Sequence, residues 1–256
     1  IPRKDIPAKV DGTAGFGIDV DIEGMKYAAV KAPPVIGASV ESINAETAKT
    51  MPGVLQILNM GNFVAVIADG YWQAQQALNT VEATYSQAEG ADLDQAAIFA
   101  RYARALDDAG TDGGDIETEQ GDAIGAIGKA ARTVKAEYKV PFLAHATMEP
   151  MNCTARVADG QCDLWLGTQN PLAVRREVAE ALGLDEERVN LENQYLGGGF
   201  GRRSATDVPI MAARLAKAAG YPVKMIWSRE EDTAQDMYRP SATSRFEAGL
   251  DAKGNL

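Results

Sequence analysis

The chain reads Leu196-Gly197-Gly198-Gly199-Phe200-Gly201-Arg202-Arg203 at the point where a strand pattern gives way to a helix pattern. Before this stretch, residues 189–195 alternate with the two-residue period of a strand, and after it apolar residues recur at helical spacing from Val208 to Leu215. The glycines are therefore predicted to join a strand to a helix. Because glycine has no Cβ atom, its N–H groups can approach a ligand closely, and a helix N-terminus favours an anion.

Arg202 and Arg203 follow the glycines directly. A guanidinium group can make two parallel hydrogen bonds to a phosphate, so we predict a phosphate or pyrophosphate site with both arginines at its mouth. The alternative is a glycine-rich turn with two solvated arginines, since glycine clusters are first of all turn signals. Neither standard phosphate motif is present: Arg202 replaces the last glycine of a dinucleotide fingerprint counted from Gly197, and Ala123 replaces the first glycine of the nearest P-loop candidate.

Composition limits the classes of protein and ligand. A hydrophobic content of 46% in 256 residues is that of a globular protein with one large or two ordinary domains. The formal charge of −11 argues against nucleic-acid binding. The sequence contains no run of about 18 apolar residues, so no transmembrane segment is predicted. One histidine and two cysteines cannot form a structural zinc or iron–sulfur site, so any metal must arrive with a cofactor.

The two cysteines are predicted to be free thiols. Residues 152–157 and 162–166 form a predicted hairpin around Asp159-Gly160, a typical two-residue turn pair. This register places Cys162 opposite Val157. Cys153 would then lie roughly 13 Å along the strand from that partner, too far for a disulfide.

The periodicity of the remaining sequence predicts an α+β protein. In the first part we expect strands at 16–22, 25–31, 54–59, 63–68 and 81–85, helices at 45–50 and 71–78, a compact strand–helix–strand unit over 63–85, and a linker at 87–92. In the second part we expect helices at 93–104, within 122–131 and at 172–182, strands at 134–140, 223–227 and 241–250, and an exposed acidic loop at 107–114.

Two strand-to-helix corners can face one ligand. The first lies at Gln169, where Asn170 suits the helix N-cap and Pro171 the first helical position, and the second lies at Gly198. The corners meet if their strands are neighbours, as consecutive elements usually are. Because the chain opens without methionine and stops after a turn at 251–255, where a return strand should begin, we expect an internal fragment of a longer polypeptide.

Several motifs together resemble the molybdenum-binding subunit of the xanthine dehydrogenase and aldehyde oxidase family. The motifs are Pro2-Arg3-Lys4-Asp5 to Gly12, Met51-Pro52-Gly53-Val54, Gly167-Thr168-Gln169-Asn170-Pro171 and Gly197-Gly198-Gly199-Phe200-Gly201. The stretch from His145-Ala146-Thr147-Met148-Glu149-Pro150 to Arg203 is most similar to the isoquinoline 1-oxidoreductase branch. The resemblance implies a small α/β hammerhead-like domain at 1–87, followed at 88–256 by part of a molybdopterin-binding domain with mixed sheets.

The resemblance also implies an activity. Such proteins oxidise an aldehyde or an N-heterocycle with water-derived oxygen and pass electrons to a [2Fe-2S] small subunit that carries the iron–sulfur clusters. The implied cofactor is molybdopterin cytosine dinucleotide with molybdenum. Gln169 matches the glutamine beside the molybdenum centre, and the base glutamate is expected beyond Leu256, so the chain alone is expected to be inactive and without cofactor. The implied cofactor-binding residues are Gln169, Gly198, Gly199, Phe200, Gly201, Arg202 and Arg203, with no metal ligand from this chain.

Other interpretations remain open. Arg202, Arg203 and Ser204 stand where some relatives carry a substrate-contacting glutamate, so purine-like recognition is not expected. His145 and Glu149 are either proton-transfer groups or, more often for such residues, structural ones. Trp165 and Tyr195 are expected in the core. Since the chain lacks a complete acid–base or nucleophile constellation, the alternative function is a non-catalytic phosphate- or nucleotide-binding assembly module.

Overall fold

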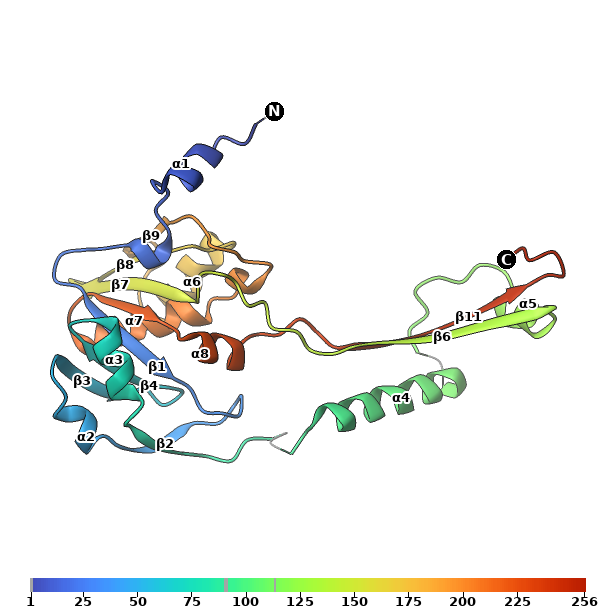
Figure 1. The fold of residues 1–256 in the computed structure, drawn as a ribbon, viewed down its shortest axis with the longest axis horizontal. Coiled ribbons are helices and arrows are strands. Elements are labelled where there is room, and N and C mark those ends of the chain that lie inside the picture. The colour runs from blue at the N-terminus through green and yellow to red at the C-terminus, as the bar shows by residue number, and fades with distance from the viewer. Residues whose placement is uncertain (1, 90–91, 113) are drawn as a thin grey trace. The chain divides into compact units, whose positions relative to one another are not determined.

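The fold comes from a computed structural model that describes residues 2–89, 92–112 and 114–256 (Figure 1). The chain divides into two compact units, the first formed by Ile1–Glu89 with Ala144–Met237 and the second by Gly90–Leu143 with Tyr238–Leu256. Among the described residues, no helix has both the length and the apolar character needed to cross a bilayer. The predicted α+β class with mixed sheets is confirmed.

A seven-stranded mixed sheet forms the centre of the first unit. Its order is β3 (Val54–Asn59), β4 (Val64–Ala68), β1 (Lys26–Lys31), β10 (Val223–Ile226), β7 (Asn152–Ala158), β8 (Gln161–Leu166) and β9 (Val189–Asn193). The pairs β1–β10 and β8–β9 are parallel, and the other neighbouring pairs are antiparallel. Strands from the first and the last part of the sequence thus share one sheet. The division into a domain at 1–87 and a domain at 88–256 stays a prediction.

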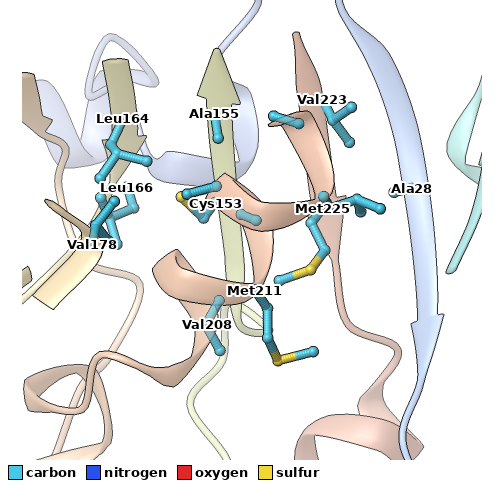
Figure 2. Packing of buried hydrophobic residues seen from close by; sticks show 14 of the residues in the cluster. Ala28, Cys153, Ala155, Leu164, Leu166, Val178, Val208, Met211, Val223 and Met225 are labelled. Atoms are coloured by element: carbon cyan, nitrogen blue, oxygen red, sulfur yellow. The ribbon is translucent and has the colours of Figure 1, made fainter. Parts of the chain in front are cut away.

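Both faces of this sheet are buried, as the near-continuous apolar strand sequences require. In β4, Ala65 and Ile67 belong to one hydrophobic cluster, whereas Val64 and Val66 belong to another on the opposite face. Helices α6 (Pro171–Leu182) and α7 (Asp207–Ala219) cover the first cluster, and α2 (Glu46–Lys49) and α3 (Tyr71–Leu78) cover the second. Figure 2 shows Val208 and Met211 of α7 beside Cys153 and Met225 of the sheet.

The N-terminal part departs from prediction in two places. The predicted strand 16–22 is wrong: the chain forms α1 (Ile6–Asp11) and then a 3₁₀ turn, η1 (Gly17–Asp19), because the Asp19 carboxylate accepts the Phe16 N–H and ties the turn closed. The predicted strand–helix–strand unit is present as β4, α3 and β5 (Glu82–Tyr85), which pack in one hydrophobic cluster, and the second departure is the partner of its last strand. β5 does not join β4 but pairs with β2 (Val40–Asn44), a strand that was not predicted.

The hairpin prediction is confirmed in register. Val157 pairs with Cys162, and Asp159 and Gly160 have φ values of 51° and 70°, as a type I′ turn requires. Both thiols are free and fully buried. Burial raises the pKa of the Cys162 thiol to about 12 and that of Cys153 well above its usual range.

The second unit contains an antiparallel ribbon of β6 (Arg132–Val140) and β11 (Ala242–Leu250), together with α4 (Gln95–Asp112) and α5 (Ala123–Gly128). The predicted acidic loop is wrong over 107–112, because α4 continues through it and Asp107 accepts a hydrogen bond from Arg245 of β11. The predicted linker at 87–92 includes residues 90–91, which lie outside the described residues.

Candidate functional site

The glycine loop, residues 196–201, leaves the edge strand β9 and leads to α7 through an intervening turn. Tyr195 extends β9 by a single parallel bridge to Phe16, and after the loop the chain forms the 3₁₀ turn η3 (Arg202–Ser204). The predicted order of strand, glycine loop and helix is confirmed, but η3 lies between the loop and α7, which begins at Asp207. The loop's N–H groups, rather than the N-terminus of α7, therefore form the candidate anion site.

The side chain of Gln169 contacts the glycine loop, as predicted. Its Oε1 accepts a hydrogen bond from the Gly201 N–H at 3.1 Å. Since an N–H group needs an acceptor, the amide must turn its oxygen to Gly201, which leaves its NH₂ group as a donor on this exposed side chain. A Cβ atom on Gly199 would lie 2.6 Å from the same oxygen, so glycine is required there for this approach.

Backbone and side-chain hydrogen bonds join the two corners. Strands β8 and β9 are parallel neighbours, with Leu166 opposite Asn193, which confirms the predicted adjacency. The Asn193 side chain accepts the Thr168 N–H at 2.9 Å, and the Arg203 carbonyl accepts the Gln169 N–H at 3.0 Å. Gln169 is thus held in position by β9 and η3 together.

The loop itself has an unusual backbone. Gly198 and Gly201 have φ values of 105° and 104°, and Phe200, with φ of 54°, is a non-glycine residue in the left-handed region. Across the described ranges, no protein acceptor is recorded for the N–H groups of Gly198 and Gly199. Such donors suit an oxygen-rich ligand and pass the simplest test of fit for a phosphate-bearing cofactor.

Arg203 is buried behind the loop. Its Nε donates to the Gly198 carbonyl at 2.8 Å, and its Nη2 donates to the backbone carbonyl and the carboxylate of Glu149 at 2.8 and 3.1 Å. The same carboxylate accepts the N–H groups of Gly197 and Ile18 and the side-chain amide of Asn152. Burial lowers the pKa of Arg203, although the Glu149 charge opposes this shift. Glu149 thus ties the loop, through Gly197 and Arg203, to Ile18 and Asn152, which is a structural role.

Arg202 is buried on a second set of carboxylates. Its guanidinium makes two hydrogen bonds to Asp207 at 2.9 and 2.7 Å, and its Nε lies 3.0 Å from Asp236. The guanidinium also lies over the Trp227 ring, 5.6 Å from its centroid. Burial disfavours the charged form of Arg202 and lowers its pKa, but Asp207 and Asp236 have the opposite effect, and the net result is a raised pKa.

The expected placement of Arg202 and Arg203 at the mouth of the loop is therefore wrong, since their exposed fractions are 2% and 1%. A buried charged side chain is strongly unfavourable unless it is paired, and here the partners of both guanidinium groups are protein carboxylates. The two arginines hold the glycine loop from within, so phosphate contact by their side chains stays a prediction that this geometry does not favour.

His145 reaches the loop from another direction. Its Nδ1 lies 3.0 Å from each carboxylate oxygen of Asp236, and its Nε2 lies 3.7 Å from the position that a Cβ on Gly201 would take. Asp236 was not predicted as a site residue. A sequence signal for its position was available. Ser228 and Glu231 form the S-x-x-E pattern of a helix N-terminus, and the Ser228 side chain accepts the Glu231 N–H. This pattern predicts the helix α8 (Arg229–Ala234), which ends just before Asp236.

Two core predictions also need correction. Tyr195 is 39% exposed and packs against Phe16, with a centroid distance of 6.2 Å, rather than in the core. Trp165 is only half-buried, and its indole N–H donates to Glu192. Within the described part of the chain, no group of three or more histidine, cysteine, aspartate or glutamate residues is arranged to hold a metal ion.

The fold and the loop geometry define an α+β protein with a candidate anion-binding glycine loop, and comparison with known proteins gives the family. Residues 108–256 match the family described as "Molybdopterin cofactor-binding domain". The chain belongs to this family.

Two relatives by sequence carry the names of oxidoreductases or their subunits. The chain is 32% identical to isoquinoline 1-oxidoreductase subunit beta of Brevundimonas diminuta, over 97% of this chain and 33% of that protein. It is 31% identical to the protein named membrane-bound aldehyde dehydrogenase (pyrroloquinoline-quinone) of Gluconacetobacter polyoxogenes, over 98% of this chain and 34% of that protein. The chain thus spans about a third of the length of these curated relatives.

Solved structures share the fold. The chain matches quinoline 2-oxidoreductase from Pseudomonas putida 86 with a TM-score of 0.74 at 17% identity, over 98% of this chain and 37% of that one. It matches the aldehyde oxidoreductase from Desulfovibrio gigas with a TM-score of 0.73 at 19% identity, over 98% and 32% of the two chains. The family and the names of the sequence relatives give the alternative function, a non-catalytic assembly module, no support.

Proposed function

We propose that the chain is part of a molybdenum hydroxylase large subunit, which oxidises an aldehyde or an N-heterocycle with water-derived oxygen. Membership of the molybdopterin-binding family supports this proposal, as do the names of two relatives, an isoquinoline 1-oxidoreductase subunit and the molybdenum-binding subunit of an aldehyde oxidoreductase. The cofactor, when bound, supplies the two-electron redox chemistry at molybdenum. The form we propose is molybdopterin cytosine dinucleotide.

The single observation that carries the proposal is the hydrogen bond between the Gln169 side chain and the Gly201 N–H. It joins the glutamine corner and the glycine loop into one surface. On this surface the Gln169 NH₂ group and the N–H groups of Gly198 and Gly199 are donors available to oxygen atoms of the cofactor. We assign cofactor contacts to Gln169 and to residues 198–201, with Gln169 beside the reacting centre.

Arg202 and Arg203 take a different role in this proposal. Their hydrogen bonds to Asp207 and Glu149 and the ion pair of Arg202 with Asp236 preorganise the loop, so the donors need no rearrangement when the cofactor binds. Electrons would leave to a [2Fe-2S] small subunit, consistent with relatives that are named as subunits of larger enzymes.

The test uses the full-length protein, expressed from its gene in a host that makes the cofactor. Molybdenum and cytosine nucleotide are measured per protein, and aldehydes and N-heterocycles are assayed with an artificial electron acceptor. We expect near-stoichiometric molybdenum and dye reduction with at least one substrate class. A folded protein that contains neither molybdenum nor a pterin would refute the proposal.

A further inference from the structure

A second segment, residues 145–149, runs beside the glycine loop in the opposite direction. At one end, the Glu149 N–H donates to the Gly197 carbonyl at 3.0 Å. At the other end, Nε2 of His145 lies 3.7 Å from the position of a Cβ on Gly201. The imidazole therefore approaches the same glycine whose N–H binds Gln169.

The imidazole is fixed by a carboxylate. Nδ1 lies 3.0 Å from both oxygens of Asp236, and the backbone N–H of His145 donates to the same carboxylate. The His145 and Asp236 side chains are 9% and 2% exposed, and Asp236 is held in turn by Arg202 Nε at 3.0 Å. Because a carboxylate only accepts hydrogen bonds, Nδ1 carries the proton that faces Asp236, and in the neutral form of the ring Nε2 is then an acceptor.

Backbone strain marks the same place. Ala146, next to the histidine, has φ of 44°, and Phe200, next to Gly201, has φ of 54°. Non-glycine residues in this region are strained, and such residues cluster at functional sites. The turn of the β7–β8 hairpin explains the third such residue, Asp159, but neither of these two.

We propose that His145 contacts the ligand of the glycine loop, accepting through Nε2 a hydrogen bond from an N–H or O–H group of that ligand. The inference rests on the proposed function. No protein partner is recorded for Nε2 among the residues that the structure describes. At Gly201 the ligand would thus meet one donor, the Gln169 amide, and one acceptor, the His145 ring, which together select the orientation of a polar ring.

The position of the proton is tested by ¹⁵N NMR of the imidazole in the 256-residue chain without a histidine tag, because His145 is its only histidine. We expect the neutral ring to carry its proton on Nδ1 and not on Nε2, and we expect Asp236→Asn to abolish this preference. A proton on Nε2 in the wild-type protein would overturn the inference, since the ring would then be a donor at Gly201.

Contact with the ligand is tested by cofactor content. In His145→Asn, the amide NH₂ group takes the place of Nδ1 and can still donate to Asp236, whereas Nε2 is lost. We expect the full-length variant to keep the wild-type unfolding temperature and to retain about three- to tenfold less molybdenum after dialysis, the range for one lost hydrogen bond. His145→Gln, which restores a polar atom near the Nε2 position, should recover part of the loss.

The outcomes separate the two proposals. Wild-type protein loaded with molybdenum, together with equally loaded His145→Asn, overturns the role of His145 and leaves the proposed function intact. Wild-type protein without molybdenum refutes the proposed function, and with it the contact proposed for His145. His145→Asn that loses cofactor while it keeps its stability supports both.

Discussion

Replacing Glu149 by glutamine should destabilise the first unit strongly. The carboxylate is 7% exposed and accepts hydrogen bonds from Ile18, Asn152, Gly197 and Arg203. Glutamine removes the charge opposite a buried guanidinium and turns an NH₂ group toward one pair of these donors. Removing one partner of a buried ion pair costs about 3–5 kcal/mol. For a unit of this size, each kcal/mol lowers the unfolding midpoint by roughly 2–4 °C, so the expected decrease is about 6–20 °C.

Tryptophan fluorescence during thermal unfolding measures this effect selectively. All three tryptophans of the chain, Trp72, Trp165 and Trp227, lie in the first unit. The matched control is Glu187→Gln, the same chemical change at an exposed position, where the expected change is within about 0.5 kcal/mol.

A double-mutant cycle tests the cause. Replacing a buried ion pair with apolar residues is often nearly neutral, so Glu149→Leu with Arg203→Met should be less destabilised than the sum of the two single variants. If Glu149→Gln unfolds at the temperature of the Glu187→Gln control, or if the two single effects simply add, the buried pair does not hold the loop and our reasoning is refuted.

Four further predictions follow from particular residues. Gly199→Ala should lower cofactor content with little loss of stability, because the added Cβ meets the exposed Gln169 side chain at 2.6 Å. Cys153 and Cys162 should react with a thiol reagent only after unfolding. Because the folded-state pKa of Cys162 is raised from 9.0 to about 12, its contribution to stability is present below pH 9 and should be lost as pH rises toward 12, by at most about 1.4 kcal/mol per pH unit. Gly160→Ala should destabilise the hairpin by about 1 kcal/mol, since φ is 70° there.

Each of these predictions has its own check. Gly128→Ala, where an added Cβ meets nothing within 4 Å, is the control for Gly199→Ala, and equal molybdenum contents in the two would contradict the steric argument. Cys162→Ala should flatten the stability decrease above pH 9, and an unchanged pH profile would exclude the thiol as its cause. Urea unfolding of Gly160→Ala without a shift in midpoint would argue against a type I′ turn.

Local signals in the sequence predicted the parts of the fold that local chemistry determines. Asp159-Gly160 fixed the hairpin register because few other residue pairs adopt positive φ twice in succession. Asn170, Pro171 and Gly183 placed both ends of α6 because each residue satisfies a requirement of a helix terminus. The approach of Gln169 to the glycine loop followed from the adjacency of two consecutive strands.

Long-range pairing was beyond these signals. Nothing near Lys26 in the sequence indicates that it pairs with Val223, and strand β2, with only one buried residue, lacks a clear apolar pattern. The arginines were placed at the mouth of the loop because a sequence shows charge but not partners. Arg203 finds its carboxylate at Glu149 and Arg202 finds one at Asp236, and only the folded sheet brings these groups together.

The location of molybdenum tests the central claim most directly, since the claim is that Gln169 and residues 198–201 form the cofactor surface. Anomalous diffraction at the molybdenum edge, measured on crystals of the cofactor-loaded full-length protein, locates the metal without assumptions about the pterin. We predict one peak beside the Gln169 amide, on the side of the chain where Gly198 and Gly199 present their N–H groups. A peak remote from Gln169 and the glycine loop would contradict the assignment of the site.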